Sequence, residues 1–156
     1  MQTLFIKPLN PEYEKRILRN PSLNVDSFIL PSPFAADSSL RKDYKHSLVW
    51  EEEREILGYM EVWSTPDRDR LHIYRQVTSP FGRGKGIGSA FISYLAEHAP
   101  KDAIIDLYVW ERQAETLSFY KKRGFNEVER IAWRALSFIL VRGNPAYIIK
   151  RSGETS

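Results

Sequence analysis

The six residues from Arg83 to Gly88 combine three glycines with two basic side chains, a combination that can bind phosphate. Glycines adopt backbone angles closed to other residues, so successive N–H groups can turn toward one anion. The apolar periodicity after the run predicts a helix, whose unpaired first-turn N–H groups and positive dipole end would add to the site. Arg83 and Lys85 bring full charges to the same place. The run therefore predicts a phosphate site at a strand–helix junction.

The spacing of the glycines excludes two well-known phosphate loops. A Walker loop needs a second glycine five positions after the first, but Ile87 follows Gly82 at that distance and Ser89 follows Gly84. The dinucleotide fingerprint would likewise require glycine in place of Ile87. The pattern that remains is Arg-x-x-Gly-x-Gly, formed by Arg83, Gly86 and Gly88.

This pattern resembles the acyl-CoA pyrophosphate loop of the GNAT superfamily of N-acetyltransferases. The resemblance extends over roughly residues 46–150, because further stretches are similar to the family's strands and helices in the same order. These stretches are 48–63, 71–80, 106–109, 117–125 and 143–150. The first 45 residues agree only in general outline.

The resemblance implies a fold and an activity. We expect an α/β three-layer sandwich, with a central mixed and mostly antiparallel sheet of about six to seven strands flanked by helices. The implied activity is transfer of an acetyl group from acetyl-CoA to a primary amine of a small molecule or peptide, by direct attack in a ternary complex. The alternative is a non-catalytic acyl-CoA-binding regulatory or interaction module.

The resemblance also implies which residues hold acetyl-CoA. Backbone donors of the glycine run and of the following helical turn would bind the pyrophosphate, and strand groups around Val77 and Thr78 would pair with the pantetheine amides. Gln113 stands where the family often has an asparagine near the cofactor, and Lys121 or Lys122 could meet the 3′-phosphate. The expected cofactor-binding residues are Val77, Thr78, Arg83, Gly84, Lys85, Gly86, Ile87, Gly88, Ser89, Gln113 and Tyr120.

Tyr120 occupies the family's usual tyrosine position, four residues before Gly124. A phenol with a pKa of about 10 is protonated at neutral pH and can donate to the CoA thiolate as it leaves. The competing interpretation is a packing aromatic, because Leu117 and Tyr120 share one face of the expected helix.

A base would help the acceptor, because an ammonium must lose a proton before its nitrogen can attack. The family often has a carboxylate six positions before the residue aligned with Thr78, and this chain has His72 there. Histidine is a competent base near neutral pH, and general-base help is typically about 10²–10⁴-fold. A structural histidine on the face of the sheet is the competing interpretation. Glu61 on the preceding strand is the substitute candidate, and a water chain is a third.

Length and composition restrict the remaining possibilities. The 156 residues predict one domain at 1–152 with a disordered tail at 153–156. The absence of cysteine excludes disulfides and thiolate nucleophiles, and the three histidines show no metal-ligand spacing, so no metal is expected. No apolar run approaches the roughly 20 residues of a membrane span, so we expect a cytoplasmic protein. The net charge of +3 does not decide between a polyanionic cofactor and a nucleic acid, but the scattered basic residues argue against a nucleic-acid partner. Monomer and homodimer remain open.

The element pattern must place these groups together. Helices are expected at 11–19, 86–98 and 114–123, and strands at 3–7, 46–53, 56–64, 71–77 and 103–109. We expect one long strand or a bulged pair at 127–141 and a closing strand at 146–150. The acidic run at 51–55 is interpreted as a solvated hairpin turn. Residues 22–45 are the least predictable, because Pro31 and Pro33 break any strand.

Overall fold

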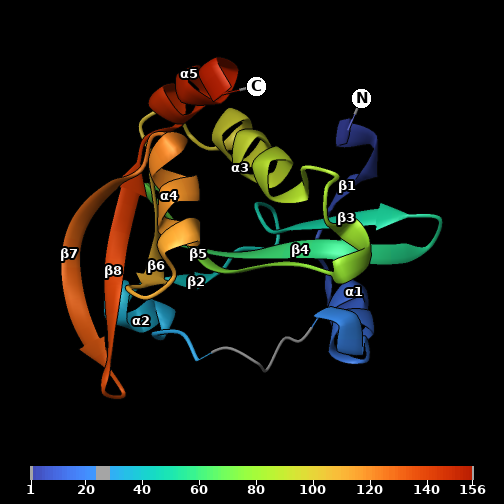
Figure 1. Ribbon diagram of the computed structural model, residues 1–156, viewed down its shortest axis with the longest axis horizontal. Helices are drawn as coiled ribbons and strands as arrows, with labels where there is room; N and C mark the ends of the chain where they lie inside the picture. Colours follow the sequence, from blue (N-terminus) through green and yellow to red (C-terminus); the bar gives the residue numbers. More distant parts are fainter. Residues whose placement is uncertain (1, 24–28, 156) are drawn as a thin grey trace.

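The computed structural model describes residues 2–23 and 29–155, and it contains one central sheet with helices on both faces (Figure 1). The strand order is β1-β3-β4-β5-β6-β8-β7, and β2 pairs with β4 beside this path. The pair β5·β6 is parallel and the other pairs are antiparallel. The expected α/β sandwich with a mixed, mostly antiparallel sheet is therefore confirmed.

The strands are β1 (Ile6–Pro8), β2 (Arg41–Lys42), β3 (Leu48–Glu52), β4 (Glu55–Ser64), β5 (Arg70–Thr78), β6 (Ile104–Trp110), β7 (Asn126–Trp133) and β8 (Leu136–Gly143). The α-helices are α1 (Pro11–Leu18), α2 (Pro33–Ala36), α3 (Ile87–His98), α4 (Ala114–Lys122) and α5 (Pro145–Thr155). Short 3₁₀ turns lie at η1 (Gln2–Phe5), η2 (Pro21–Leu23) and η3 (Pro80–Gly82).

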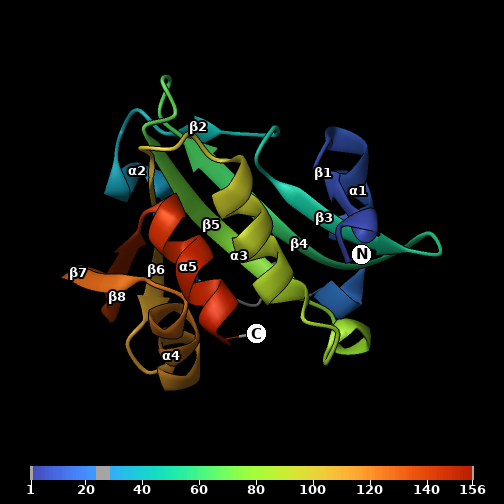
Figure 2. The same cartoon turned by 90° about the horizontal axis from the view of Figure 1, so that it is seen from above.

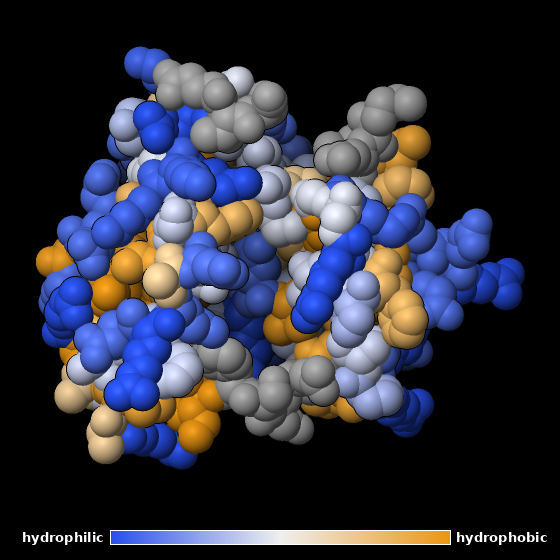
Figure 3. Space-filling view, in the orientation of Figure 1, coloured by the Kyte–Doolittle hydropathy of each residue, from blue (hydrophilic) through white to orange (hydrophobic). Residues whose placement is uncertain are grey.

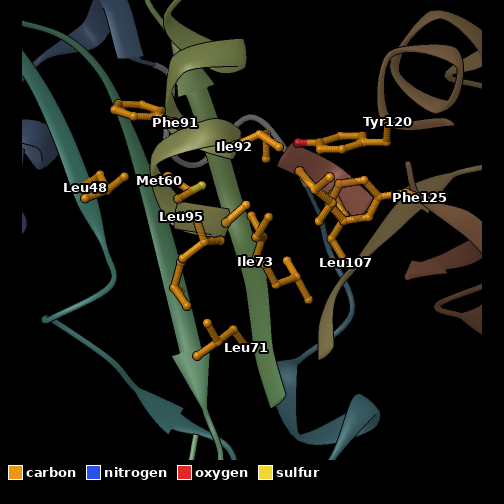
Figure 4. Close-up of a cluster of buried hydrophobic side chains, with 14 of the residues drawn as sticks. Leu48, Met60, Leu71, Ile73, Phe91, Ile92, Leu95, Leu107, Tyr120 and Phe125 are labelled. Carbon is orange, nitrogen blue, oxygen red and sulfur yellow. The ribbon is translucent and has the colours of Figure 1, made fainter. Parts of the chain in front are cut away.

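The main core lies between the sheet and helices α3, α4 and α5. Figure 2 shows α3 crossing β4 and β5, with α5 beside it. Apolar side chains of α3 contact alternate residues of β4, β5 and β6, and Tyr120 of α4 closes the cluster (Figure 4). Helix α1 covers the opposite face over β3 and β4 through a second cluster that includes Leu9, Ile17 and Tyr59. None of the helices within the described residues is long and apolar enough to cross a membrane.

The strand expected at 146–150 is wrong, because this stretch forms α5. The side chain of Asn144 accepts a hydrogen bond from the backbone N–H of Tyr147 at 2.9 Å, which caps the first turn. Pro145 stands at the first helical position, where its missing N–H costs nothing. Ile148 is buried against the core, whereas Tyr147 and Ile149 are exposed. The helix continues through Thr155, into the predicted disordered tail, and Ser156 lies outside the described residues.

Two other boundaries differ from the sequence prediction. The amino-terminal strand begins only at Ile6, because residues 2–5 form a 3₁₀ turn instead. The segment at 127–141 is the bulged-pair alternative, two strands whose register shifts between Glu127 and Glu129. Their turn places Arg134 and Ala135 at φ values of 50° and 66°, a left-handed conformation that glycine or asparagine would have signalled.

The acidic run at 51–55 is only partly the solvated turn that the sequence predicted. Glu53 and Arg54 make the tight β3–β4 turn, with φ values of 49° and 68°. Glu51, in contrast, accepts hydrogen bonds from Lys7 at 2.8 Å, from the Tyr13 hydroxyl at 2.8 Å and from Arg16 at 2.9 Å. This carboxylate of β3 therefore links α1 to the sheet and adds a side-chain contact between β3 and β1.

Acidification is expected to remove the contribution of Glu51 to stability. The hydrogen bond from Lys7, followed by those from Tyr13 and Arg16, lowers the pKa of Glu51 from 4.5 to about 2. A carboxylate with a lowered folded-state pKa stabilises the fold above pH 4.5, and this contribution disappears as the pH falls toward 2. The shift corresponds to at most about 3.4 kcal/mol, and the exposure of Lys7 and Arg16 reduces the expected value to about 1–2 kcal/mol.

Urea unfolding of Glu51→Gln and the unchanged protein, at pH 7 and in steps toward pH 2, measures this difference. The exposed Glu53→Gln in the same hairpin is the control and should match the unchanged protein. Equal stabilities of Glu51→Gln and the unchanged protein at pH 7 would contradict the expectation.

Candidate active site

The sheet opens between β5 and β6. The two strands pair only where Arg70, Leu71 and His72 stand opposite Ile104, Ile105 and Asp106. Opposite β4, the register passes from Glu61↔Arg75 to Val62↔Ile73, so Tyr74 is the extra residue of a β-bulge. A bulge bends its strand and increases its twist. Beyond His72 the two strands therefore separate.

A cleft of about 400 Å³ lies in this opening, lined by β5 from Ile73 to Thr78 and by β6 from Leu107 to Val109. In the orientation of Figure 1, the surface is hollowed near the middle of the view (Figure 3). Val77 and Thr78 line the cleft, as expected for residues that hold a ligand by their backbone. Gln113, which precedes α4, lines it as well.

The glycine run forms the turn between η3 and α3. Gly84 and Gly86 have φ values of 83° and 73°, and Gly86 is the residue that precedes the helix. The first N–H groups of α3 have no intrahelical partner and are available to an anion. A Cβ on Gly88 would lie 2.8 Å from the Gln76 amide nitrogen, so a larger residue there would displace the end of the Gln76 side chain.

A second hollow of about 450 Å³ lies over this turn and reaches α4. The expected loop residues that line it are Arg83, Gly84, Gly86, Ile87, Gly88 and Ser89. Thr78, Gln76 and Tyr120 line both this hollow and the cleft, so the two spaces meet at these residues. Lys85 lies elsewhere, with its Nζ 3.1 Å from Glu52 of the β3–β4 hairpin.

Tyr120 stands at the junction of the two spaces. Its ring packs edge-on against Phe119 and Phe125, at centroid distances of 5.0 and 5.3 Å. The hydroxyl donates to the Gln76 side-chain oxygen at 3.3 Å, and in Figure 4 it is directed from α4 toward β5 and α3. Burial raises the pKa of Tyr120 well above its ordinary value, so the phenol stays protonated and remains a donor.

The structure does not bring the two candidate bases into the cleft lining. His72 is only 1% exposed, and its Nδ1 lies 2.8 Å from Asp106. Glu61 accepts a hydrogen bond from the Trp63 indole at 2.7 Å and lies 4.0 Å from the Lys42 ammonium. Neither is among the described residues that line either space.

Asp106 is the centre of a buried charge cluster. Besides His72, it accepts hydrogen bonds from Arg70 Nε at 2.8 Å and from Arg142 at 3.3 Å. Burial alone would raise the pKa of Asp106, but the bond from His72 and the charge of Arg70 outweigh burial and hold the pKa below 3.8. The carboxylate therefore stays ionised and fixes the His72 ring.

The sequence prediction missed Gln76 and Arg123, which both lie at the site. Gln76 contacts Tyr120, and strand alternation from Thr78 could have placed it on that face. Arg123 lies 3.6 Å above the Phe119 ring and donates to Ser89 Oγ at 2.7 Å, linking α4 to the first turn of α3. Of the two lysines suggested for a 3′-phosphate, Lys122 lines a further hollow beside Arg123, and Lys121 pairs with Glu127 at 3.2 Å.

The donor set around the glycine run suits a phosphate-bearing ligand. Backbone N–H groups of the glycine run and the Arg83 side chain can bind a pyrophosphate, and the adjoining cleft meets this hollow at Tyr120. Within residues 2–23 and 29–155, no three His, Cys, Asp or Glu side chains are grouped as metal ligands.

Comparison with known proteins identifies the family of this chain and shows other proteins with the same fold. The acetyltransferase (GNAT) family matches residues 12–125 in sequence, while no curated protein matches the chain. Among solved structures, Arabidopsis thaliana Naa50 in complex with the bisubstrate analogue CoA-Ac-MVNAL aligns with a TM-score of 0.68 and 16% identity, over 89% of this chain and 97% of its own.

Two further solved structures align equally well. Chaetomium thermophilum Naa20, also bound to a bisubstrate analogue, aligns with a TM-score of 0.68 and 21% identity, over 94% of this chain and 89% of its own. The spermidine N-acetyltransferase SpeG of Vibrio cholerae aligns with a TM-score of 0.68 and 15% identity, over 94% and 96%. At these identities, the likeness shows a shared fold.

Proposed function

Because the chain belongs to the acetyltransferase (GNAT) family, we propose that it transfers an acetyl group from acetyl-CoA to a primary amine of a peptide or small molecule. The observation that carries this proposal is the meeting of the glycine-run hollow and the β5–β6 cleft at Tyr120. A phosphate cradle and a reaction cleft that share a buried, protonated phenol suit thioester aminolysis.

The chain's own residues would hold and align the two reactants. Acetyl-CoA supplies the thioester carbonyl that the amine attacks, so an N–C bond forms and a C–S bond breaks. The turn from Arg83 to Ser89 binds the pyrophosphate, and backbone groups near Val77 and Thr78 bind the pantetheine arm. Alignment of two reactants in this way can be worth about 7–11 kcal/mol of the barrier. Tyr120 donates its proton to the departing thiolate.

The proton that the amine loses needs a second group. His72 is the proposed base, since Asp106 holds its Nδ1 and thereby orients the ring. Glu61 is the substitute. Both lie outside the described cleft lining, so either would act through water.

The charge of the cleft bears on the acceptor. Among the described residues that line it, the charged side chains are Arg75 and Arg83, and the rest are polar, apolar or aromatic. Spermidine carries several positive charges and gains nothing from such a lining. We therefore favour an acceptor with a single amine, such as a peptide amino terminus, over a polyamine.

Acetyl-CoA is expected to stabilise the protein. At about a hundred times its dissociation constant, it should add about 2.7 kcal/mol, which is roughly 5–11 °C in melting temperature for a domain of this size. Thermal unfolding with and without acetyl-CoA measures the shift, and adenosine, which lacks the pyrophosphate, is the control. No shift would contradict both the transferase and the non-catalytic CoA module.

Release of CoA thiol in the presence of amines separates those two functions. The proposed enzyme releases thiol with an amine such as the peptide Met-Val-Asn-Ala-Leu, whereas a binding module shows the thermal shift without release. Thermal unfolding with ATP in place of acetyl-CoA tests whether the glycine run binds a different phosphate ligand. A stabilisation by ATP but not by acetyl-CoA would indicate that it does.

A further inference from the structure

Tyr108 lines the cleft, and its buried hydroxyl forms a hydrogen bond with none of the described residues. The side chain comes from β6, lines the cleft and is 6% exposed. Its ring packs against Phe138 and Leu140 of β8. The hydroxyl oxygen forms no hydrogen bond with any described residue. Because buried polar groups are nearly always hydrogen-bonded, this one is suited to a partner that arrives with a ligand.

The surroundings of Tyr108 hold the hydroxyl in place. The ring lies edge-on to His72 at a centroid distance of 5.5 Å, and His72 is itself fixed by Asp106. Burial, followed by the charges of Glu129 and Asp106, raises the pKa of Tyr108, so the phenol stays neutral. A neutral phenol can both donate and accept a hydrogen bond, and its partner need not be charged.

Tyr108 and Tyr120 approach the cleft from opposite faces of the sheet. Leu107 and Val109 belong to the core under α3 with Tyr120, so Tyr108 between them points to the other face. The Tyr120 hydroxyl already has Gln76 as a partner, whereas the Tyr108 hydroxyl has none among the described residues. The cofactor hollow lies on the Tyr120 side, which leaves the Tyr108 side to the acceptor.

We propose that the Tyr108 hydroxyl is the binding point for the acceptor amine, accepting a hydrogen bond from its N–H and holding its nitrogen in the cleft. This inference rests on the proposed acetyltransferase function. The direction of the bond follows from the chemistry. The amine must keep its lone pair for attack on the carbonyl, so its N–H donates a hydrogen bond to the phenol oxygen and its nitrogen accepts none from the phenol. Tyr108 thereby orients the lone pair toward the cofactor side.

The test compares Tyr108→Phe with the unchanged protein. Three probes are used: the peptide Met-Val-Asn-Ala-Leu, spermidine, and n-butylamine as a minimal primary amine. For each amine that is acetylated, we expect kcat/KM to fall about 10-fold, mainly through KM, as for loss of one hydrogen bond. The factor should be similar for n-butylamine and the peptide, because the hydroxyl contacts the amine itself.

Two controls separate this role from a structural one. The melting temperature of Tyr108→Phe without ligand should be unchanged or higher, since the lost hydroxyl has no partner, and its shift with acetyl-CoA should be unchanged. Tyr147→Phe removes an exposed phenol on α5 and should leave kcat/KM unchanged.

The outcomes are distinguishable. An unchanged kcat/KM in Tyr108→Phe, or a fall confined to the peptide, would overturn the inference while leaving the acetyltransferase in place. If no probe is acetylated, the affinities of the unchanged protein and of Tyr108→Phe for the bisubstrate analogue CoA-Ac-MVNAL and for CoA test the inference. An affinity gain over CoA that disappears in Tyr108→Phe supports the inference, and one that persists, or no gain at all, overturns it.

Discussion

Replacing Tyr120 by phenylalanine is expected to lower kcat about 100-fold or more, with the affinity for acetyl-CoA changed by no more than about twofold. The hydroxyl lies where the hollow over the glycine run and the β5–β6 cleft meet, 3.3 Å from Gln76. Since burial raises the pKa of Tyr120, the phenol keeps its proton in alkaline solution and can donate it as the thiolate departs. Proton transfer of this kind typically contributes about 10²–10⁴-fold.

The measurement separates catalysis from packing. Tyr120→Phe keeps the ring that contacts Phe119 and Phe125, so stability should fall only by about 0.5–1.5 kcal/mol for the lost hydrogen bond. Thiol release gives kcat, and calorimetric titration gives the affinity for acetyl-CoA. Tyr94→Phe, on α3 outside both spaces, is the matched control. An unchanged kcat would leave Tyr120 as a packing aromatic.

The largest effect on stability is expected at Asp106. Replacing it by asparagine should destabilise the fold by about 3–5 kcal/mol, since loss of one member of a buried charge cluster leaves the others uncompensated. Asp106 is 0% exposed, and Arg70, Arg142 and His72 all bond to it. The melting temperature should fall by roughly 6–20 °C.

Urea unfolding at pH 7 measures this loss, and the exposed Asp102→Asn, in the turn before the same strand, is the control. The sign of the pH dependence provides a second check. Because the folded-state pKa of Asp106 lies below 3.8, its charge stabilises the protein above that pH. The difference between the variant and the unchanged protein should therefore narrow as the pH falls below 3.8. A loss under about 1 kcal/mol at pH 7 would mean that the arginines find other partners.

The sequence alone predicted the parts of this protein that local rules govern. The glycine run and the apolar periodicity of the helix after it are encoded within a few residues, and α3 forms at 87–98. The α/β class and the mixed sheet followed from the family pattern, which the match at 12–125 bears out. Where local signals were absent, the prediction failed. The turn at Arg134–Ala135 has no glycine, and the helix that Asn144 caps was predicted as a strand at 146–150.

Tertiary structure alone decided which side chains meet. Gln76 reaches Tyr120 across 44 positions, and His72 reaches Asp106 across 34. The cleft exists because a bulge at Tyr74 turns β5 away from β6. The residue pattern within one strand does not predict where a neighbouring strand will run. The burial of the Tyr108 hydroxyl, away from any partner in the described part of the chain, follows from that opening and from the packing of Phe138. Local sequence sets the backbone of each element, whereas burial and partners depend on residues that only folding brings together.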